Sequence, residues 1–144
     1  MLIRVVSAGV VSAAFCFLFQ VQGLNIAAAG LNGALGYLIY LSFPDDRILT
    51  GLLLASAFMA AYAEAAARIR KAPSIMFLSA ALIPVVPGGG LFECALKLLN
   101  GQKYEAMNQF GEVMLEAGAI AVGIILVSSV MQIVTGKNAL KRSH

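Results

Sequence analysis

The chain has 144 residues, of which 60% are hydrophobic and only 12% charged, with a formal net charge of +3. Soluble domains are about half apolar and a quarter charged, so this composition and the mean hydropathy of +0.88 indicate an all-α integral membrane protein. At about 20 residues per membrane span, a single membrane domain over residues 1–144 leaves no room for a catalytic, nucleotide-binding or nucleic-acid-binding domain.

The first 44 residues predict two membrane spans. Residues 5–44 contain no charged side chain, and one helix of that length would measure about 60 Å, twice the thickness of the hydrocarbon. The chain must therefore fold back once, between spans at about 3–19 and 26–43. Polar and flexible residues predict the turn; they are Gln20, Gln22, Gly23 and Asn25.

Two further spans are expected beyond the polar turn at 44–47, where Asp45 and Asp46 can cap the next helix. The third span covers about 48–69. The fourth covers about 73–90 and is broken, because two prolines and three glycines in seven residues cannot continue a regular helix. The residues of this break are Pro84, Pro87, Gly88, Gly89 and Gly90.

The carboxyl-terminal third predicts a short helix at Leu91–Leu99 and a last helix from about Tyr104 to Thr135, ended by Gly136. A helix of 32 residues measures about 48 Å, which exceeds the hydrocarbon thickness. We therefore expect its first turns to project from the membrane or to lie along the interface, and the fifth span to cover about 110–135.

The basic residues predict the orientation. In the five-span arrangement, six of them lie in the loop after span three and in the tail, and four lie on the other side. The positive-inside rule places the larger group in the cytoplasm, which puts the amino terminus outside and the carboxyl terminus inside. The larger group is Arg68, Arg70, Lys71, Lys137, Lys141 and Arg142; the smaller is Arg4, Arg47, Lys97 and Lys103.

The broken span is the strongest functional signal. Irregular backbone at membrane depth is tolerated only where it is buried in protein or lines a water-filled cavity. The three glycines leave backbone N–H groups unshielded, and the positive end of the helix that follows points to the same place, so an anionic or zwitterionic ligand is expected there. The alternative is a tight re-entrant turn that binds nothing.

Two pairs of charged residues, each one helical turn apart, are candidates for coupling or ion pairing. Glu64 and Arg68 share one face of the third span, as a structural pair or as part of an ion path. Glu112 and Glu116 on the last helix carry like charges, which suits a proton-coupled carrier or, alternatively, a solvated pair at the membrane surface.

The second span carries small residues at helical spacing, Gly30, Gly33 and Gly36, with Asn32 among them. Such a surface allows close contact between helices, and the amide can donate a hydrogen bond across it. We interpret these residues as packing. No His or Cys cluster has metal-ligand spacing and no phosphate-binding loop is present, so no metal and no cofactor are expected.

The chain resembles the small-subunit branch of the threonine/serine exporter family, which corresponds to the carboxyl-terminal half of single-chain exporters. The resemblance rests on Glu-x-x-x-Arg at 64–68, the basic patch before Pro73, Pro-x-x-Pro-Gly at 84–88, and the small-residue span at 33–40. Length and span count agree over nearly the whole chain.

The resemblance implies one subunit of a secondary exporter in the bacterial inner membrane, and not an enzyme. Family substrates are threonine and serine, and some two-component members are linked to dicarboxylates such as succinate. The partner would be a second membrane subunit that resembles the amino-terminal half of the single-chain exporters. Two alternatives stay open: a structural or assembly protein that forms homo-oligomers without transport, and a passive pore.

Overall fold

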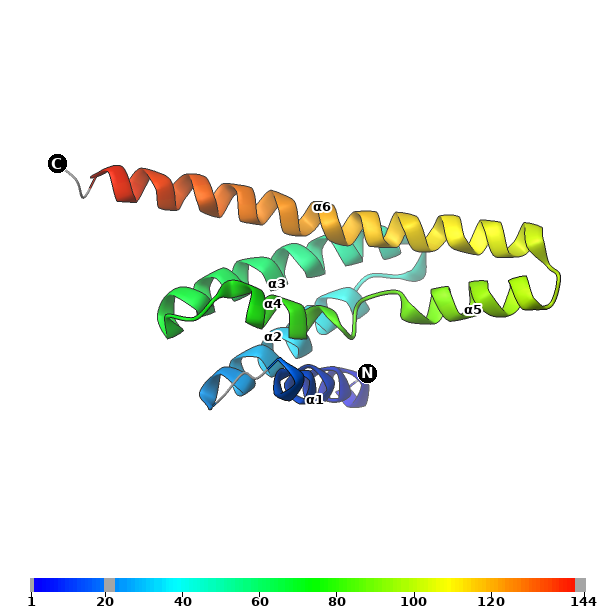
Figure 1. Cartoon of the computed structure of the whole chain (residues 1–144), viewed down its shortest axis with the longest axis horizontal. Helices are drawn as coiled ribbons and strands as arrows, with labels where there is room; N and C mark the ends of the chain where they lie inside the picture. Colours follow the sequence, from blue (N-terminus) through cyan, green and yellow to red (C-terminus); the bar gives the residue numbers. More distant parts are fainter. Residues whose placement is uncertain (1, 20–22, 142–144) are drawn as a thin grey trace.

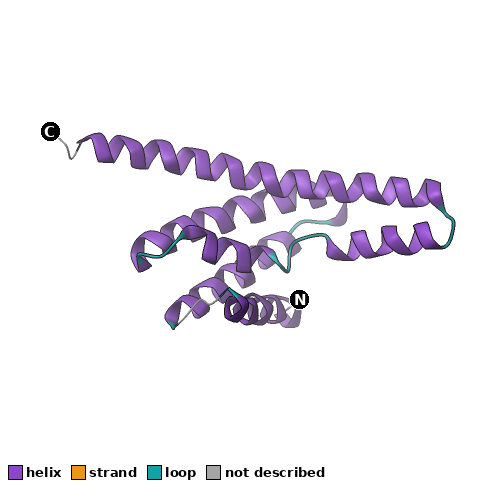
Figure 2. Ribbon diagram, viewed as in Figure 1, coloured by secondary structure: helices purple, strands orange, loops and turns teal. Residues whose placement is uncertain are grey.

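The computed structural model describes residues 2–19 and 23–141, and this part of the chain is all-helical (Figures 1 and 2). Three helices are long and apolar enough to cross a membrane, and α1 is apolar but shorter. The expected fold class, an all-α polytopic membrane protein, is confirmed. The elements are α1 (Leu2–Leu18), α2 (Leu24–Leu41), the 3-10 turn η1 (Asp45–Arg47), α3 (Ile48–Arg70), α4 (Ser74–Leu82), α5 (Gly88–Leu99) and α6 (Lys103–Lys141).

Small residues bring α1 and α2 into close contact. A Cβ atom on Gly30 would lie 3.1 Å from the backbone carbonyl oxygen of Gly9, and one on Gly33 would collide with the Ser12 hydroxyl. In a membrane, where lipid tails are as apolar as side chains, close backbone approach of this kind is a main source of helix association. Both glycines therefore lie in the interface between the two helices.

The contact between α2 and α3 combines a glycine with a buried amide. A Cβ atom on Gly36 would collide with the side chain of Met59. Asn32 is 0% exposed, and its Nδ2 donates a hydrogen bond to the carbonyl oxygen of Met59 at 3.2 Å. The structure thus places the small-residue surface of the second span between α1 and α3.

The core consists of two clusters along this bundle. The first lies among α1, α2, α3 and α4 and is built from Cys16, Ala29, Ala63, Ala66, Phe77 and Ala80. The second joins α3, α4 and the following loop to α6 through Leu52, Met59, Ala81, Val85 and Ile120. Val85, in the segment just after α4, is therefore part of the packed interior.

The helices α3 and α6 run side by side in the same direction, so that their carboxyl-terminal ends lie at one end of the molecule (Figure 1). Contact is close where Gly123 faces the backbone of α3 at Leu53. The first turns of α6 extend beyond the start of α3 and pack against α5 instead. Within the described chain α5 contacts α6 and no other helix, so these two segments form a projecting hairpin.

Two helix boundaries differ from the sequence prediction. The glycines Gly88–Gly90 form the first turn of α5, which the sequence predicts to start at Leu91. At the other end α6 continues through Gly136 to Lys141. A glycine inside a helix costs only about 1 kcal/mol, so a glycine alone does not have to end one. Gly88–Gly90 do not adopt the positive φ that is typical of a helix end.

The polar turns also differ in detail. The N-cap residues of η1 and α3 are Pro44 and Arg47, and neither makes a side-chain capping hydrogen bond. The expected capping by Asp46 is therefore wrong, because its carboxylate lies 3.9 Å from the Nε atom of Arg47 instead; the side chain of Asp45 lies outside the described part of the chain. Asn25, expected in the first turn of the chain, lies inside α2. Gln20 and Gln22, predicted for the same turn, lie outside the described residues.

Candidate functional site

The proline element interrupts the helix inside the bundle. Residues 83–87 separate α4 from α5, and the backbone N–H groups of Val85 and Val86 both donate to the carbonyl oxygen of Leu82, at 2.9 and 3.1 Å. Pro84 and Pro87 have no N–H group to donate. Val85 is buried in the second core cluster, where it packs with residues of α3 and α6, whereas Val86 is 51% exposed. The interruption therefore has one side in the core and the other at the surface of the described chain.

The three glycines after the interruption occupy different surroundings. A Cβ atom on Gly90 would lie 2.7 Å from Cγ2 of Val113, so this glycine allows α5 to approach α6. At Gly88 and Gly89 a Cβ atom would meet nothing within 4 Å. Gly88 and Gly89 therefore leave the start of α5 open on the side away from the bundle, and Gly90 serves helix packing.

A cleft of about 320 Å³ lies beside the interruption. Ile83 and Pro84 form one wall, the first turns of α1 form another, and Tyr37 of α2 completes it. The one charged side chain among its lining residues is Arg4. The sequence prediction did not include Arg4 among the candidate site residues; an arginine at the head of a charge-free span is the signal that was available.

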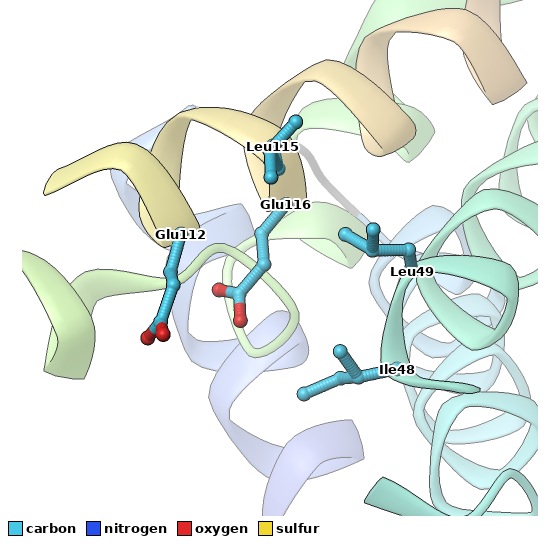
Figure 3. A pocket seen from close by; sticks show the side chains of 5 residues that line it. All are labelled: Ile48, Leu49, Glu112, Leu115 and Glu116. Atoms are coloured by element: carbon cyan, nitrogen blue, oxygen red, sulfur yellow. The ribbon is translucent and has the colours of Figure 1, made fainter. Parts of the chain in front are cut away.

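Glu112 and Glu116 line a second cavity, of about 370 Å³, between α6 and the start of α3. Figure 3 shows both carboxylates on the same side of α6, with Ile48 and Leu49 of α3 nearby. The amino-terminal end of α3 carries the positive end of the helix dipole, which favours negative charge close to it. The structure thus brings the predicted acidic pair together with the beginning of another helix.

Glu64 and Arg68 lie on the last two turns of α3, where Glu64 is half-buried and Arg68 is exposed. Neither residue lines the Arg4 cleft or the cavity at Glu112. The structure therefore does not join this pair to the other candidate residues. Among residues 2–19 and 23–141 no group of three or more His, Cys, Asp or Glu side chains could hold a metal ion.

Several apolar helices, one of them interrupted by prolines beside a cleft with a charged wall, define a polytopic membrane protein of the transporter type. Comparison with protein families identifies the transporter: the model described as "Threonine/Serine exporter, ThrE" matches residues 4–130, and the chain belongs to this family. This confirms the resemblance seen in the sequence. No curated protein and no solved structure matches the chain.

Proposed function

We propose that the chain is one subunit of a secondary exporter for small amino acids such as threonine and serine, or for dicarboxylates of the succinate type. The interruption at 83–87 carries the proposal. Transporters bind their solutes at broken helices near the middle of the membrane, and here the interrupted backbone packs against α3 and α6 and borders a cleft. Membership of an exporter family supports the same function.

The second part of the proposal is a partner subunit that covers α5. None of the residues of α5 is buried, and its apolar side faces away from α6, with Phe92 65% and Leu99 83% exposed. The opposite edge of the helix carries Glu93 and Lys97, and Lys97 donates a hydrogen bond to Gln109 at 2.9 Å. An exposed apolar stripe beside charged groups is typical of a protein interface.

The third part is the orientation in the bacterial inner membrane, with the amino terminus outside and the carboxyl terminus in the cytoplasm. The basic end of α3, with Arg68, Arg70 and Lys71, lies at the same end of the molecule as the end of α6 (Figure 1). The positive-inside rule assigns that end to the cytoplasm. The hairpin of α5 and the first turns of α6 then projects on the outer side.

The fourth part of the proposal is that Glu112 and Glu116 couple transport to the movement of protons. Glu112 and Glu116 are one turn apart beside a cavity, and two like charges at that spacing repel each other. Gain of one proton relieves the repulsion and its loss restores it, and a proton-coupled carrier uses such a change of charge. Glu64 and Arg68 are the second candidate pair for this role.

Flux measurements test the proposal. The full chain is reconstituted into proteoliposomes with and without a candidate second subunit, and uptake of labelled serine, threonine and succinate is measured with an imposed pH gradient and with the gradient collapsed. We expect flux only with both subunits, and accumulation only with the gradient.

Two results would contradict the proposal. Flux that equilibrates the solute but never accumulates it, with or without the gradient, would make the protein a passive pore. Absence of flux with every candidate subunit, together with a stable homo-oligomer, would make it an assembly protein.

A further inference from the structure

We infer that Arg4 binds the carboxylate of the transported solute in the cleft between α1, α2 and the interruption of the fourth span. The inference deepens the proposed function and rests on it, because it names the residue that would recognise the solute. It gives a function to the cleft and to the Arg4 side chain, whereas the proposed function so far rests on the broken backbone alone.

The cleft has the size and composition of a small-molecule site. Its volume of about 320 Å³ falls within the range of about 300–1,000 Å³ that such sites occupy. Its apolar walls are interrupted by few polar groups, which is the usual pattern of a site that orients its ligand. Its lining residues are Ile3, Arg4, Ser7, Ala8, Val11, Tyr37, Ile83 and Pro84.

The electrostatics of the cleft favour an anion. Arg4 lies in the first turn of α1, which contains no acidic residue, so the guanidinium and the positive end of the helix dipole act at the same place. Arg4 makes no salt bridge with any residue that the structure describes; the pair that is present joins Arg47 to Asp46. Arg4 is exposed, so its guanidinium is accessible at the edge of the cleft, where it provides two parallel donors that match a carboxylate.

The same cleft contains acceptors for the cationic end of an amino acid. In a continuous helix the carbonyl oxygen of Ile83 would accept from residue 87, but Pro87 has no N–H group to donate. The hydroxyl of Ser7 donates to the carbonyl oxygen of Ile3 at 2.8 Å, which leaves its own oxygen lone pairs available. A positive donor on one lining residue and acceptor oxygens on two others, Ile83 and Ser7, suit a zwitterion better than a simple anion.

A lipid phosphate presents the same anionic chemistry and is the competing source of the ligand. Binding is therefore measured with the full chain in nanodiscs of phosphatidylcholine alone and in nanodiscs that also contain phosphatidylglycerol. Labelled threonine and succinate are the probes, and threoninamide and succinamide, which lack the free carboxylate, are the competitors. The variants are Arg4→Gln, Arg4→Lys and, as the matched control, Arg47→Gln.

We expect wild-type protein in phosphatidylcholine to bind threonine or succinate, and the amides to compete at least about tenfold more weakly, because each loses a charge-assisted hydrogen-bonded pair. Arg4→Gln should lower affinity by at least about tenfold. Arg4→Lys should recover part of the loss, because lysine keeps the charge without the planar fork. Arg47→Gln should bind as the wild type does.

Three outcomes would overturn the inference. Wild-type affinity in Arg4→Gln would remove Arg4 from the site. An equal loss of affinity in Arg47→Gln would show that the effect comes from general surface charge and not from Arg4. Absence of solute binding in phosphatidylcholine, combined with Arg4-dependent stabilisation by phosphatidylglycerol, would assign Arg4 to a lipid headgroup.

Flux separates the inference from the function on which it rests. If the two-subunit exporter transports and its Arg4→Gln form transports equally well, the inference fails and the proposed function stands. If carboxylate binding depends on Arg4 but no subunit pair transports, the exporter proposal fails and the binding site stands.

Discussion

Gly123 provides a sharp test of the packing between α6 and α3. A methyl group at this position would collide with the Ser56 hydroxyl, and it would lie 2.5 Å from the carbonyl oxygen of Leu53, about 0.9 Å inside the 3.4 Å at which ordinary contact begins. A backbone oxygen cannot rotate away, so Gly123→Ala must displace α6 from α3. Overpacking of this kind costs about 1–3 kcal/mol.

The same helix supplies a matched control. At Gly118 an added Cβ atom would meet nothing within 4 Å. Alanine is favoured over glycine inside a helix by about 1 kcal/mol, so Gly118→Ala should leave stability unchanged or raise it. Gly123→Ala gains the same helix propensity but pays the steric cost of the displacement. The two variants should therefore differ in the free energy of unfolding by about 1–3 kcal/mol.

The chain carries its own reporter for this measurement. Cys16 is 0% exposed in the first core cluster, so a maleimide should label it only after the bundle opens. In a Cys94→Ser background, labelling is followed while the fraction of sodium dodecyl sulfate in mixed micelles is raised. We expect the midpoint to fall for Gly123→Ala and not for Gly118→Ala. Coinciding midpoints would refute the argument that α3 and α6 are in van der Waals contact here.

Three further tests address separate parts of the molecule. Gly90→Ala should weaken the contact between α5 and α6, whereas Gly89→Ala should be tolerated; equal stability of the two, measured by thermal unfolding, would contradict the packing described for Gly90. Lys71→Gly should stabilise the chain by about 0.5–1 kcal/mol, because Lys71 has a φ of 52°, and a lower unfolding temperature would show that this conformation is not retained. Glu112→Gln should fold normally yet lose pH-dependent flux, whereas Glu64→Gln should keep it; loss of that flux in Glu64→Gln, with no recovery in the double variant with Arg68→Gln, would move the coupling role to Glu64.

The helices and the position of the interruption could be predicted because each depends on local chemistry. Long apolar runs need helical hydrogen bonding in a membrane, and Pro84 and Pro87 cannot donate to the preceding turn whatever surrounds them. The boundary at Gly88 was not predictable in the same way. Glycine permits both a helix and a turn, and Gly90 is held in α5 by its contact with Val113, which is distant in sequence.

The cleft at Arg4 could not be predicted from the sequence, for a related reason. Its lining comes from the beginning of α1, from Tyr37 of α2 and from the first two residues after α4, and hydropathy gives no information on which spans are neighbours. The pairing of Asp46 with Arg47, in place of a helix cap, likewise depends on the path of the loop. By contrast, Glu112 and Glu116 share a face simply because they are four residues apart on a helix.

The hairpin of α5 and the first turns of α6 is attached to the rest of the protein in two very different ways. At one end it continues into a single helix of 39 residues, about 58 Å long at 1.5 Å per residue; at the other it is tethered by residues 83–87, which are not helical. The continuous helix α6 is therefore the rigid connection of the hairpin, and residues 83–87 are the flexible one. A force applied to the apolar stripe of α5 is therefore transmitted through α6 to the contact of α6 with α3. The helix α4, which packs against α1, α2 and α3, is joined to the hairpin only through the non-helical residues 83–87.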